Sequence, residues 1–552
     1  MATKKQRSCQ SRTVDLLVPE LGPSLNDLVG HIPLIGKDAL PGDMENAYGS
    51  IEHNIRSRDE TVLIRIPREF MCHAGIGLMD NADTILYVRP RTLTQIVFMN
   101  RDVLGYGYVG HIFGQPGTGK STTALFFAAC IAVEKRWSVL WAHLSVGVPD
   151  NCWVCMHMRP DGSYMTLNLD DAGMAEYLRE FGRSQNSDDA LGYCVVLDGM
   201  EFDGKAKKIP ARLWYLENPR ERRLILISSD GVDKGLSGGE RNEKKIRIFR
   251  QWSWKKEDYE AALSISAFKR HVANFFDSPD APDVPDGLSG TARRLHNKFF
   301  IAGGCARWMF TCTSSEAQAD IDGAVVKGFQ SGEIMPRIVS RLFSRSTRTD
   351  ISIVSEYAKQ RMLESMGTMQ LNALKRHPMI AQCDNGALGQ LFQLYVYFDT
   401  YERTARKETV TFRNRSGIDL AVRFQSVVRA HIQTLNRSDC LLMTLVWPYS
   451  FYQPAFDGFY ITKVGSEDMI VFLQVTVGEK HSVDLLKLMT LMERFNVQFC
   501  EFYFIIPMHM MAKFKIGAIL NPKALIDFGW PTDDAGIRKR IQICGLDGWG
   551  NG

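Results

Sequence analysis

Apolar and polar residues follow two different periods in the first half of the chain. Short apolar runs at 108–114 and 138–144 have the length and composition of strands, whereas 121–134 repeats apolar positions at helical spacing. Two more apolar runs, 193–197 and 224–227, also have the character of strands. Because strands that alternate with helices form a parallel sheet covered by helices, the pattern predicts an α/β domain.

An interruption in this alternation predicts a β-hairpin. Two alternating runs, 152–158 and 163–169, are joined by Arg159-Pro160-Asp161-Gly162, whose Pro and Gly suit a tight reversal. Asp170 and Asp171 then cap a helix that is expected to reach about Gly182.

The second half of the chain changes pattern twice. Residues 255–375 are mainly helical, apart from three Pro-Asp steps in 279–286 that no helix can contain. A helix is expected from about Gly417, followed by strands and by one amphipathic helix before the last strand. The apolar positions of the first helix are Leu420, Phe424, Val427, Val428 and Ile432. The strands are expected at 441–446, 456–461, 470–477 and 502–507, with the amphipathic helix at 482–495.

The composition indicates a cellular compartment but no particular binding partner. Of 552 residues, 66 are Lys or Arg and 62 are Asp or Glu, which leaves a net charge of +4. Twelve scattered cysteines form no disulfide framework and indicate a reducing compartment. The apolar stretch 124–133 falls short of the roughly 20 residues that cross a bilayer, so no membrane span is expected. The basic residues Lys4, Lys5 and Arg7 lack a following apolar stretch, and they fit either a nuclear address or a solvated tail.

Residues 114–121, Gly-Gln-Pro-Gly-Thr-Gly-Lys-Ser, match the phosphate-binding pattern G-x-x-x-x-G-K-[ST] between an expected strand and an expected helix. The glycines let the backbone curl with its N–H groups inward, and the helix N-terminus adds partial positive charge. Lys120 is expected to bridge the β- and γ-phosphates, and the Ser121 hydroxyl to bind Mg²⁺. ATP and Mg²⁺ are therefore the expected cofactors. The expected nucleotide-binding residues are Gly114, Gln115, Pro116, Gly117, Thr118, Gly119, Lys120, Ser121 and Thr122.

A P-loop site also needs an acidic residue at the end of a neighbouring apolar strand, and Asp198 supplies it as the expected second magnesium ligand. Many ATPases place Glu after this Asp, but Gly199 follows here and the nearest acid is Glu201, so slow hydrolysis or a base from elsewhere is expected. Ser229 ends the next strand, where it can sense the γ-phosphate. Lys120, Asp198 and Ser229 are the expected catalytic residues of this domain. Arg307 fits either a phosphate-stabilising residue or the surface of a lid helix.

Two further elements accompany the loop and the acidic strand. Gln251-Trp252-Ser253-Trp254 leads into Lys256-Glu257-Asp258-Tyr259, and residues 299–310 read FFIAGGCARWMF. In this order the features resemble the Crinkler effectors and the retrotransposon hot spot proteins, over about residues 100–330. The resemblance implies an AAA-like or STAND-like ATPase coupled to a nuclease-like domain of the restriction-endonuclease fold, acting in a nucleus. The chain lacks the Leu-x-Leu-Phe-Leu-Ala-Lys header of Crinklers, so the resemblance does not extend to secretion and delivery.

A metal-dependent nuclease of that fold needs a carboxylate on one strand and an acid-x-Lys pair on the next. Asp457 and Gln474 lie on two expected neighbouring strands, with Asp457 as the expected metal ligand. Gln474 offers an amide oxygen where Glu is usual, Thr476 replaces the lysine, and Lys480 or His481 can supply the charge. Three interpretations stay open: a working nuclease that uses Asp457, Gln474 and His481, an inactive fold that binds nucleic acid, and a hairpin with an incidental Asp.

Other polar clusters are weaker signals. The segment 241–256 has seven basic residues, one acid and two tryptophans, which suits nucleic acid or a solvated face. Cys152-x-x-Cys155 favours buried or edge thiols, because no second pair lies at zinc-site spacing. Asp419 could add a carboxylate at the start of the expected helix. A basic ridge at helical spacing is formed by Arg337, Arg341, Arg345 and Arg348.

The predicted fold class is α/β: a P-loop NTPase with a parallel sheet and a helical lid, followed by a restriction-endonuclease-like α/β domain. The predicted parts are 1–100 (a lead-in of unknown role), 101–250 (the NTPase core), 251–410 (helical lid and linker), 411–525 (the nuclease-like domain) and 526–552 (a tail).

The first functional hypothesis is a Crinkler-like effector, in which a Mg-dependent ATPase controls a nuclease-like domain in a nucleus. The alternative is a nucleotide-switched protein that binds a host factor or DNA without cleavage, and Gly199 and Gln474 are the residues that favour it. A third is a signalling ATPase that assembles on ATP. The expected partners are the nucleotide, nucleic acid, a host nuclear protein and a second copy of the chain, with no membrane.

Overall fold

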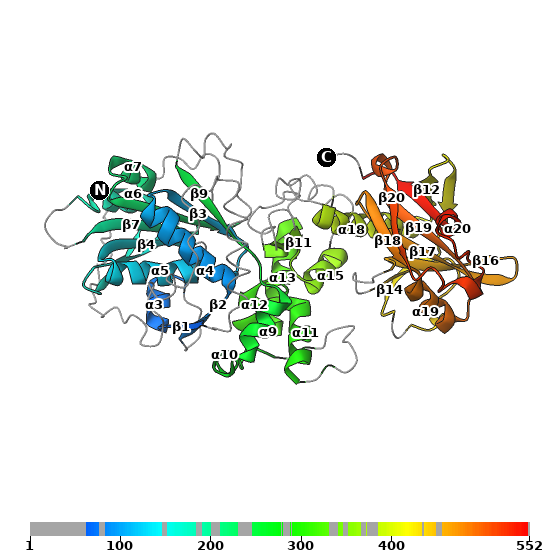
Figure 1. Cartoon of the computed structure of the whole chain (residues 1–552), viewed down its shortest axis with the longest axis horizontal. Coiled ribbons are helices and arrows are strands. Elements are labelled where there is room, and N and C mark those ends of the chain that lie inside the picture. The colour runs from blue at the N-terminus through cyan, green and yellow to red at the C-terminus, as the bar shows by residue number, and fades with distance from the viewer. Residues whose placement is uncertain are drawn as a thin grey trace, which may run out of the picture. The chain divides into compact units, whose positions relative to one another are not determined.

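The computed structural model folds the chain into two compact units (Figure 1). Unit 1 consists of Met1–Asp277 and Gly304–Thr313, and unit 2 of Ser278–Gly303 and Ser314–Gly552. The residues that the structure describes are 62–76, 83–145, 152–183, 190–199, 210–229, 245–277, 279, 288, 290–329, 341–345, 351–365, 371, 385–432, 435–448 and 455–549.

Unit 1 is built on a seven-stranded sheet in the order β6-β5-β4-β7-β8-β3-β9. The five strands from β4 to β9 are mutually parallel, and β5 and β6 add an antiparallel hairpin at one edge. Both the predicted parallel sheet and the inserted hairpin are confirmed. The strands are β3 (Val109–Gly114), β4 (Trp137–Ser145), β5 (Cys152–Met158), β6 (Tyr164–Leu169), β7 (Gly192–Asp198), β8 (Arg222–Ser229) and β9 (Ile246–Gln251).

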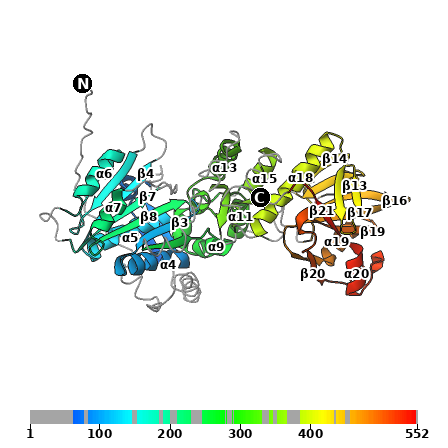
Figure 2. The ribbon, with the colours of Figure 1, turned by 90° about the horizontal axis from the view of Figure 1, so that it is seen from above.

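Helices cover both faces of this sheet, with α4 and α6 on opposite sides in Figure 2. On one face α4 (Pro90–Val97), the π-helix η1 (Phe98–Gly105) and α5 (Lys120–Glu134) bury an apolar core, and α5 is apolar around most of its circumference. On the other face lie α6 (Asp171–Glu180) and α7 (Pro210–Glu217). The predicted cap is present, because Asp170 accepts a hydrogen bond from the Gly173 N–H at 2.7 Å.

The described residues between 62 and 100 pack into the same core as the strands of the sheet. Ile64, Ile96 and Phe98 are almost fully buried in the hydrophobic cluster that also contains Phe127. The indole of Trp141 donates to the carbonyl of Ala74 at 2.9 Å. The described part of the predicted lead-in is therefore an integral layer of unit 1, formed by β1 (Val62–Ile66), α3 (Arg68–His73), β2 (Thr84–Val88) and α4.

Three short helices complete unit 1: α9 (Lys256–Ser264), α10 (Ser266–His271) and α12 (Ala306–Phe310). They meet in an aromatic cluster in which Trp254 stacks on Tyr259, with ring centroids 5.1 Å apart, and Phe310 meets both rings edge-on. This cluster joins α12 to the rest of unit 1, although the segment Ser278–Gly303 of unit 2 precedes it in the sequence.

Unit 2 contains an eight-stranded mixed sheet in the order β13-β12-β21-β19-β17-β16-β15-β14. Helix α19 (Leu485–Phe495) connects the parallel strands β17 and β19, and its apolar face packs on Phe472, Phe502 and Phe504. The strands are β12 (Val410–Asn414), β13 (Asp419–Val422), β14 (Ser426–Ala430), β15 (Thr444–Pro448), β16 (Gly458–Val464), β17 (Glu467–Val475), β19 (Phe499–Pro507) and β21 (Ile541–Leu546).

The remaining elements of unit 2 are mostly helical. The helices are α11 (Gly290–Ala302), α13 (Ser314–Phe329), α15 (Glu356–Ser365), α18 (Asn385–Ala405) and α20 (Asp534–Arg540), with 3-10 turns at Arg437–Asp439, Met508–Met510 and Ile526–Phe528. Two separate pairs of strands are β10 (Phe343–Arg345) with β11 (Ile351–Ile353) and β18 (Lys480–Asp484) with β20 (Lys515–Leu520).

The helix expected from Gly417 is wrong. Gly417 lies in a turn with φ of 77°, which the Asn414 side chain closes by accepting from the Ile418 N–H, and strands β13 and β14 follow. The apolar spacing fits a helix, but the β-branched residues of Ser426–Ala430 pair with β15 instead. Residues 526–552, expected to be a tail, include β21, an inner strand of the sheet.

Within the described residues, no helix is both long enough and apolar enough to span a membrane.

Candidate functional site

The predicted phosphate loop links β3 to α5, and its glycines take conformations that other residues avoid. Gly117 and Gly119 have φ of 76° and 92°. A Cβ atom on Gly114 would collide with the carbonyl of Gln251, and one on Gly117 with the Sγ of Cys305. The loop is therefore closely packed against β9 and α12 at these two positions, and glycine is required there.

The two expected magnesium ligands, 77 residues apart in sequence, meet beside the loop. Ser121 donates a hydrogen bond from Oγ to Asp198 Oδ1 at 2.9 Å, and the Asp198 carboxylate is buried at the end of β7. A hydroxyl and a carboxylate are hard oxygen donors of the kind that Mg²⁺ prefers, so these two residues fit the metal. The Lys120 ammonium donates to the carbonyls of Gly114 and Gln115, at 2.7 and 2.8 Å.

His143 is a residue of this site that the sequence reasoning missed. Its Nδ1 lies 2.8 Å from Asp198 Oδ2, because β4 and β7 are parallel neighbours and His143 pairs with Asp198 in register. The imidazole thus bonds to Oδ2 of Asp198 and leaves Oδ1 oriented toward Ser121. A His near the end of a strand beside the acidic strand was the available signal.

Ser229 lies where the sequence pattern predicted, at the end of β8 and opposite Gly114 on β3. The preceding Ser228 is buried and its hydroxyl bonds to His111 at 2.9 Å, so Ser229 is the more accessible of the pair. Glu201 lies outside the described residues.

A cavity of about 530 Å³ adjoins the loop within unit 1. One side is formed by Pro116–Thr122 and the opposite side by β2, the end of α10 and α12. Arg307 lines it, as the predicted phosphate-stabilising role requires, and so do Asp83 and His271. Burial lowers the pKa of His271 despite the nearby Asp83 carboxylate. The volume falls in the range of pockets that bind small molecules.

In unit 2, Asp457 and Gln474 are neighbours, as predicted. Gln474 Nε2 donates to Asp457 Oδ2 at 2.6 Å, and the Val475 N–H donates to the same oxygen at 2.7 Å. The other oxygen, Oδ1, accepts from Gln393 Nε2 of α18 at 2.9 Å. All three donors stabilise the ionised carboxylate, but Asp457 is only 4% exposed.

A lysine that the sequence did not point to supplies charge at this position. Lys359, on α15, is fully buried, and its ammonium favours the ionised form of Asp457. Desolvation prevails for both groups: it raises the pKa of Asp457 to about 7 and lowers the pKa of Lys359 to about 8. The helical segment carrying Lys359 was expected to form part of a separate lid, so no local pattern connected it with Asp457.

The other predicted polar residues of unit 2 are not brought to Asp457. His481 lies on β18, where Nδ1 bonds to the carbonyl of Ser482, and no described contact joins it to Asp457. Asp419 is in the edge strand β13, paired with Arg413 at 2.7 Å, and four strands separate it from β16. Among the described residues no group of three or more His, Cys, Asp and Glu side chains could hold a metal ion. One carboxylate with its oxygens already bonded does not fit a divalent cation.

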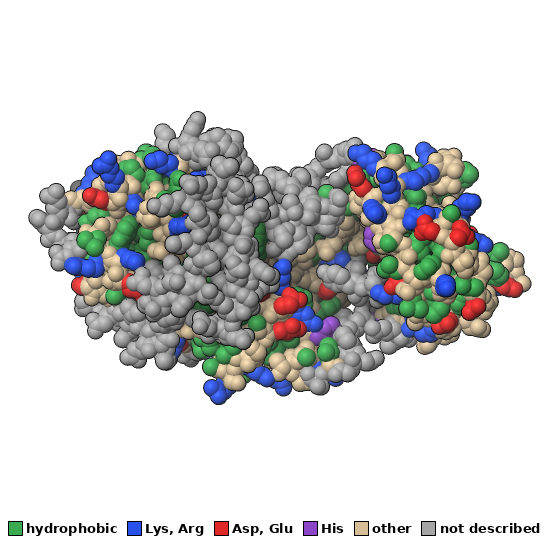
Figure 3. Space-filling view, viewed as in Figure 1, with side chains coloured by type: hydrophobic (Ala, Val, Ile, Leu, Met, Phe, Trp, Pro, Cys, Tyr) green, Lys and Arg blue, Asp and Glu red, His purple; other side chains and the backbone are tan. Residues whose placement is uncertain are grey.

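The basic ridge, the tryptophan segment and the Cys152–Cys155 pair are the weaker signals that the sequence offered. Arg337 and Arg348 lie outside the described residues, and Arg345 is buried in β10, so the predicted helical ridge is wrong at that residue. Trp254 of the basic segment is buried in unit 1 and cannot stack on a base. Cys155 is buried too, and this burial raises its thiol pKa to about 12. Figure 3 shows Lys and Arg side chains around β12 and β20, with Asp and Glu among them.

Comparison with known proteins adds little. No protein-family model matches the chain, and no curated protein matches it. Among solved structures, the crystal structure of Cdc6p from Pyrobaculum aerophilum is similar over 55% of this chain and 98% of that chain, at 12% identity and a TM-score of 0.23. A likeness this low carries no argument about function, so the site has to be interpreted from its own geometry.

Proposed function

We propose that unit 1 binds a nucleoside triphosphate with Mg²⁺ and hydrolyses it slowly. The observation that supports this proposal is the hydrogen bond between Ser121 and Asp198, which joins a hydroxyl and a carboxylate of the kind that Mg²⁺ prefers beside the phosphate loop. The loop and helix α5 would bind the phosphates, Lys120 would neutralise the γ-phosphate, and Asp198 would hold the metal that offsets charge developing during transfer. No acidic residue follows Asp198 directly, which supports a low turnover.

Nucleotide binding is tested by the melting temperature of the full chain with and without MgATP. Wild type is expected to gain about 2.7 kcal/mol of stability at a ligand concentration 100 times Kd, and Lys120→Ala to gain almost none. Lys120→Arg is the matched control, because it keeps a charge but changes the reach of the side chain. A wild-type melting point that does not respond to MgATP or MgGTP would contradict the proposal.

A second candidate function is nucleotide-switched binding of nucleic acid, in which unit 2 binds the nucleic acid without cutting it. The burial of Asp457 and Gln474, together with the lack of a fitting metal donor set among the described residues, favours binding over cleavage. The nucleic-acid partner and the nuclear location rest on the resemblance to Crinkler and retrotransposon hot spot proteins. Electrophoretic mobility shift and Mg²⁺-dependent plasmid nicking separate the two activities. Nicking by wild type that Asp457→Ala abolishes would establish the nuclease instead.

A further inference from the structure

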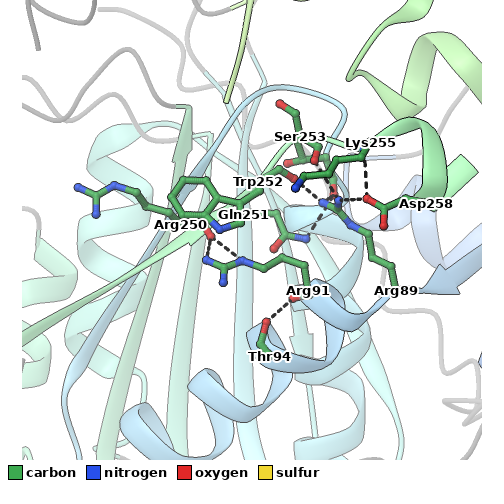
Figure 4. A network of polar contacts seen from close by, with 10 residues as sticks. Arg89, Arg91, Thr94, Arg250, Gln251, Trp252, Ser253, Lys255 and Asp258 are labelled. Atoms are coloured by element: carbon green, nitrogen blue, oxygen red, sulfur yellow. Dashed lines mark hydrogen bonds and ion pairs between the residues drawn. The ribbon is translucent and has the colours of Figure 1, made fainter. Parts of the chain in front are cut away.

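The tryptophan segment that follows β9 meets the phosphate loop through one buried arginine. Arg89, directly after β2, is 2% exposed, and its guanidinium lies beside the backbone carbonyls of Trp252 and Ser253 (Figure 4). It donates to the carbonyls of Trp252 and Ser253 and pairs with Asp258 at 3.3 Å. Its guanidinium carbon lies 5.0 Å from the ring centre of Trp254. A buried guanidinium needs partners for its charge and for its N–H groups, and this segment supplies the Asp258 carboxylate and two backbone carbonyls.

The same guanidinium also reaches the phosphate loop. Arg89 Nη2 donates to the carbonyl of Thr118, and Gln251 Nε2 donates to that carbonyl from the end of β9, each at 3.4 Å. A trans peptide is planar, so the carbonyl of Thr118 and the N–H of Gly119 point in opposite directions. Holding the carbonyl toward Arg89 therefore turns the Gly119 N–H away from it. Thr118 and Gly119 line the cavity, whereas Arg89 and Gln251 do not, so that N–H faces the cavity side.

Neighbouring carbonyls of the loop are held in the same way. Gly117 O accepts from the Ala306 N–H at 3.1 Å, and Lys120 O accepts from Gln95 Nε2 at 3.0 Å. The loop needs such restraints, because Gly117 and Gly119 have wide conformational freedom and no atom lies within 4 Å of a Cβ built on Gly119. External donors thus select the peptide orientation that anion binding requires.

We propose that Arg89 and Gln251 are positioning residues for the triphosphate: by binding the Thr118 carbonyl they orient the Gly119 N–H toward the phosphates. This inference rests on the proposed nucleotide binding of unit 1. It assigns a role to the Gln251–Trp254 segment, which holds Arg89 in place with two backbone carbonyls and one aromatic ring. The Gly119 N–H would contact the phosphate chain, which ATP and ADP share. Loss of its orientation is therefore expected to lower the affinities for ATP and for ADP together.

The test compares the Kd of MgATP and MgADP in the full chain for wild type, Arg89→Met, Gln251→Met and Arg91→Met. Arg91 is a matched control, since it is 5% exposed in the first turn of α4, lies over the Phe249 ring and donates to the Arg250 carbonyl rather than to the loop. Arg89→Met and Arg91→Met are both expected to lower the melting temperature. Only Arg89→Met and Gln251→Met are expected to raise Kd, by about tenfold, the effect of losing one hydrogen bond.

Arg89→Lys keeps the charge but not the forked donors, and it is expected to recover stability more than affinity. Equal losses of affinity in Arg89→Met and Arg91→Met would overturn the inference, because they would reflect stability alone. Wild-type affinity in Gln251→Met would also overturn it, and this variant serves if Arg89→Met does not fold. If wild type itself binds no nucleotide, the proposed function fails as well, whereas normal binding by all variants removes only the positioning role.

Discussion

At the scale of single residues, the candidate site depends on how each oxygen of one carboxylate is used. Asp198 directs Oδ1 to the Ser121 hydroxyl and Oδ2 to His143, so its orientation is determined from both sides. Asp457 shows the opposite arrangement, in which three neutral donors and a buried lysine surround a carboxylate that solvent hardly reaches. The two carboxylates therefore differ in their surroundings, and only Asp198 lies beside a phosphate loop.

Asp198→Asn is expected to lower ATP turnover by about 100-fold, because the amide keeps an acceptor for Ser121 but loses the charge that the metal requires. Nucleotide affinity in EDTA is expected to stay within about twofold of wild type, since the phosphate contacts of the loop remain. Steady-state hydrolysis and binding titrations check the two parts. Turnover equal to wild type would remove Asp198 from the reaction.

The raised pKa of Asp457 predicts that the free energy of unfolding of unit 2 depends on pH. Its folded pKa of about 7 lies above the ordinary 3.8, so the stabilisation it provides is complete below about pH 4 and is lost as the pH rises through 7. Lys359, whose pKa is lowered to about 8, stays protonated throughout that window. Compared with Asp457→Asn, wild type is expected to lose stability from pH 4 to pH 7 and then to stay level up to pH 8. Denaturant unfolding at several pH values measures this difference, and parallel curves would contradict it.

At the scale of secondary-structure elements, the loop is restrained by its neighbours more than by its own sequence. Helix α12 contacts it through Cys305 and Ala306, β9 through Gln251, and α4 through Gln95. These elements come from three separate stretches of the chain. The binding conformation of the loop is thus a property of the packed unit.

Gly117→Ala is expected to destabilise unit 1 more than Gly119→Ala. Both replacements place a side chain at positive φ, which costs about 1 kcal/mol each. Only Gly117→Ala adds a collision with Cys305 Sγ and a contact of 3.2 Å with Arg307 Cβ, worth a further ~1–3 kcal/mol. Urea unfolding of the two variants measures the difference. Equal losses would show that α12 does not pack on the loop in solution.

At the scale of the whole molecule, the chain is divided between two compact units whose boundaries do not follow the sequence order. Gly304–Thr313 belongs to unit 1, although the segment that precedes it, Ser278–Gly303, belongs to unit 2. Each unit has its own sheet and its own hydrophobic core. Such units can unfold in separate transitions.

MgATP is expected to raise the melting temperature of one calorimetric transition and to leave the other unchanged, because a ligand stabilises only the unit that binds it. At 100 times Kd the gain is about 2.7 kcal/mol. The Lys120→Ala chain provides the control, with both transitions at their ligand-free positions. A shift of both transitions in wild type would contradict this expectation, because it would mean that the nucleotide stabilises both units.

The sequence by itself determined the local features of unit 1. The strand-loop-helix order around Lys120, the strand that ends at Asp198 and the hairpin after β4 all depend on short-range periodicity and on the backbone freedom of Gly and Pro, which a sequence displays directly. Asp457 and Gln474 were paired for the same reason, since they lie near the facing ends of two consecutive strands.

Only the tertiary structure decided the rest. His143, Arg89 and Lys359 reach their sites from other strands and helices, and no local spacing encodes a contact across so many residues. The segment after Gly417 carries a helical pattern, yet it forms the two edge strands of the sheet, where pairing with β12 and β15 satisfies one side of each strand's backbone. Long-range pairing outweighs the local helical pattern here, and the partner strands are present only in the folded unit.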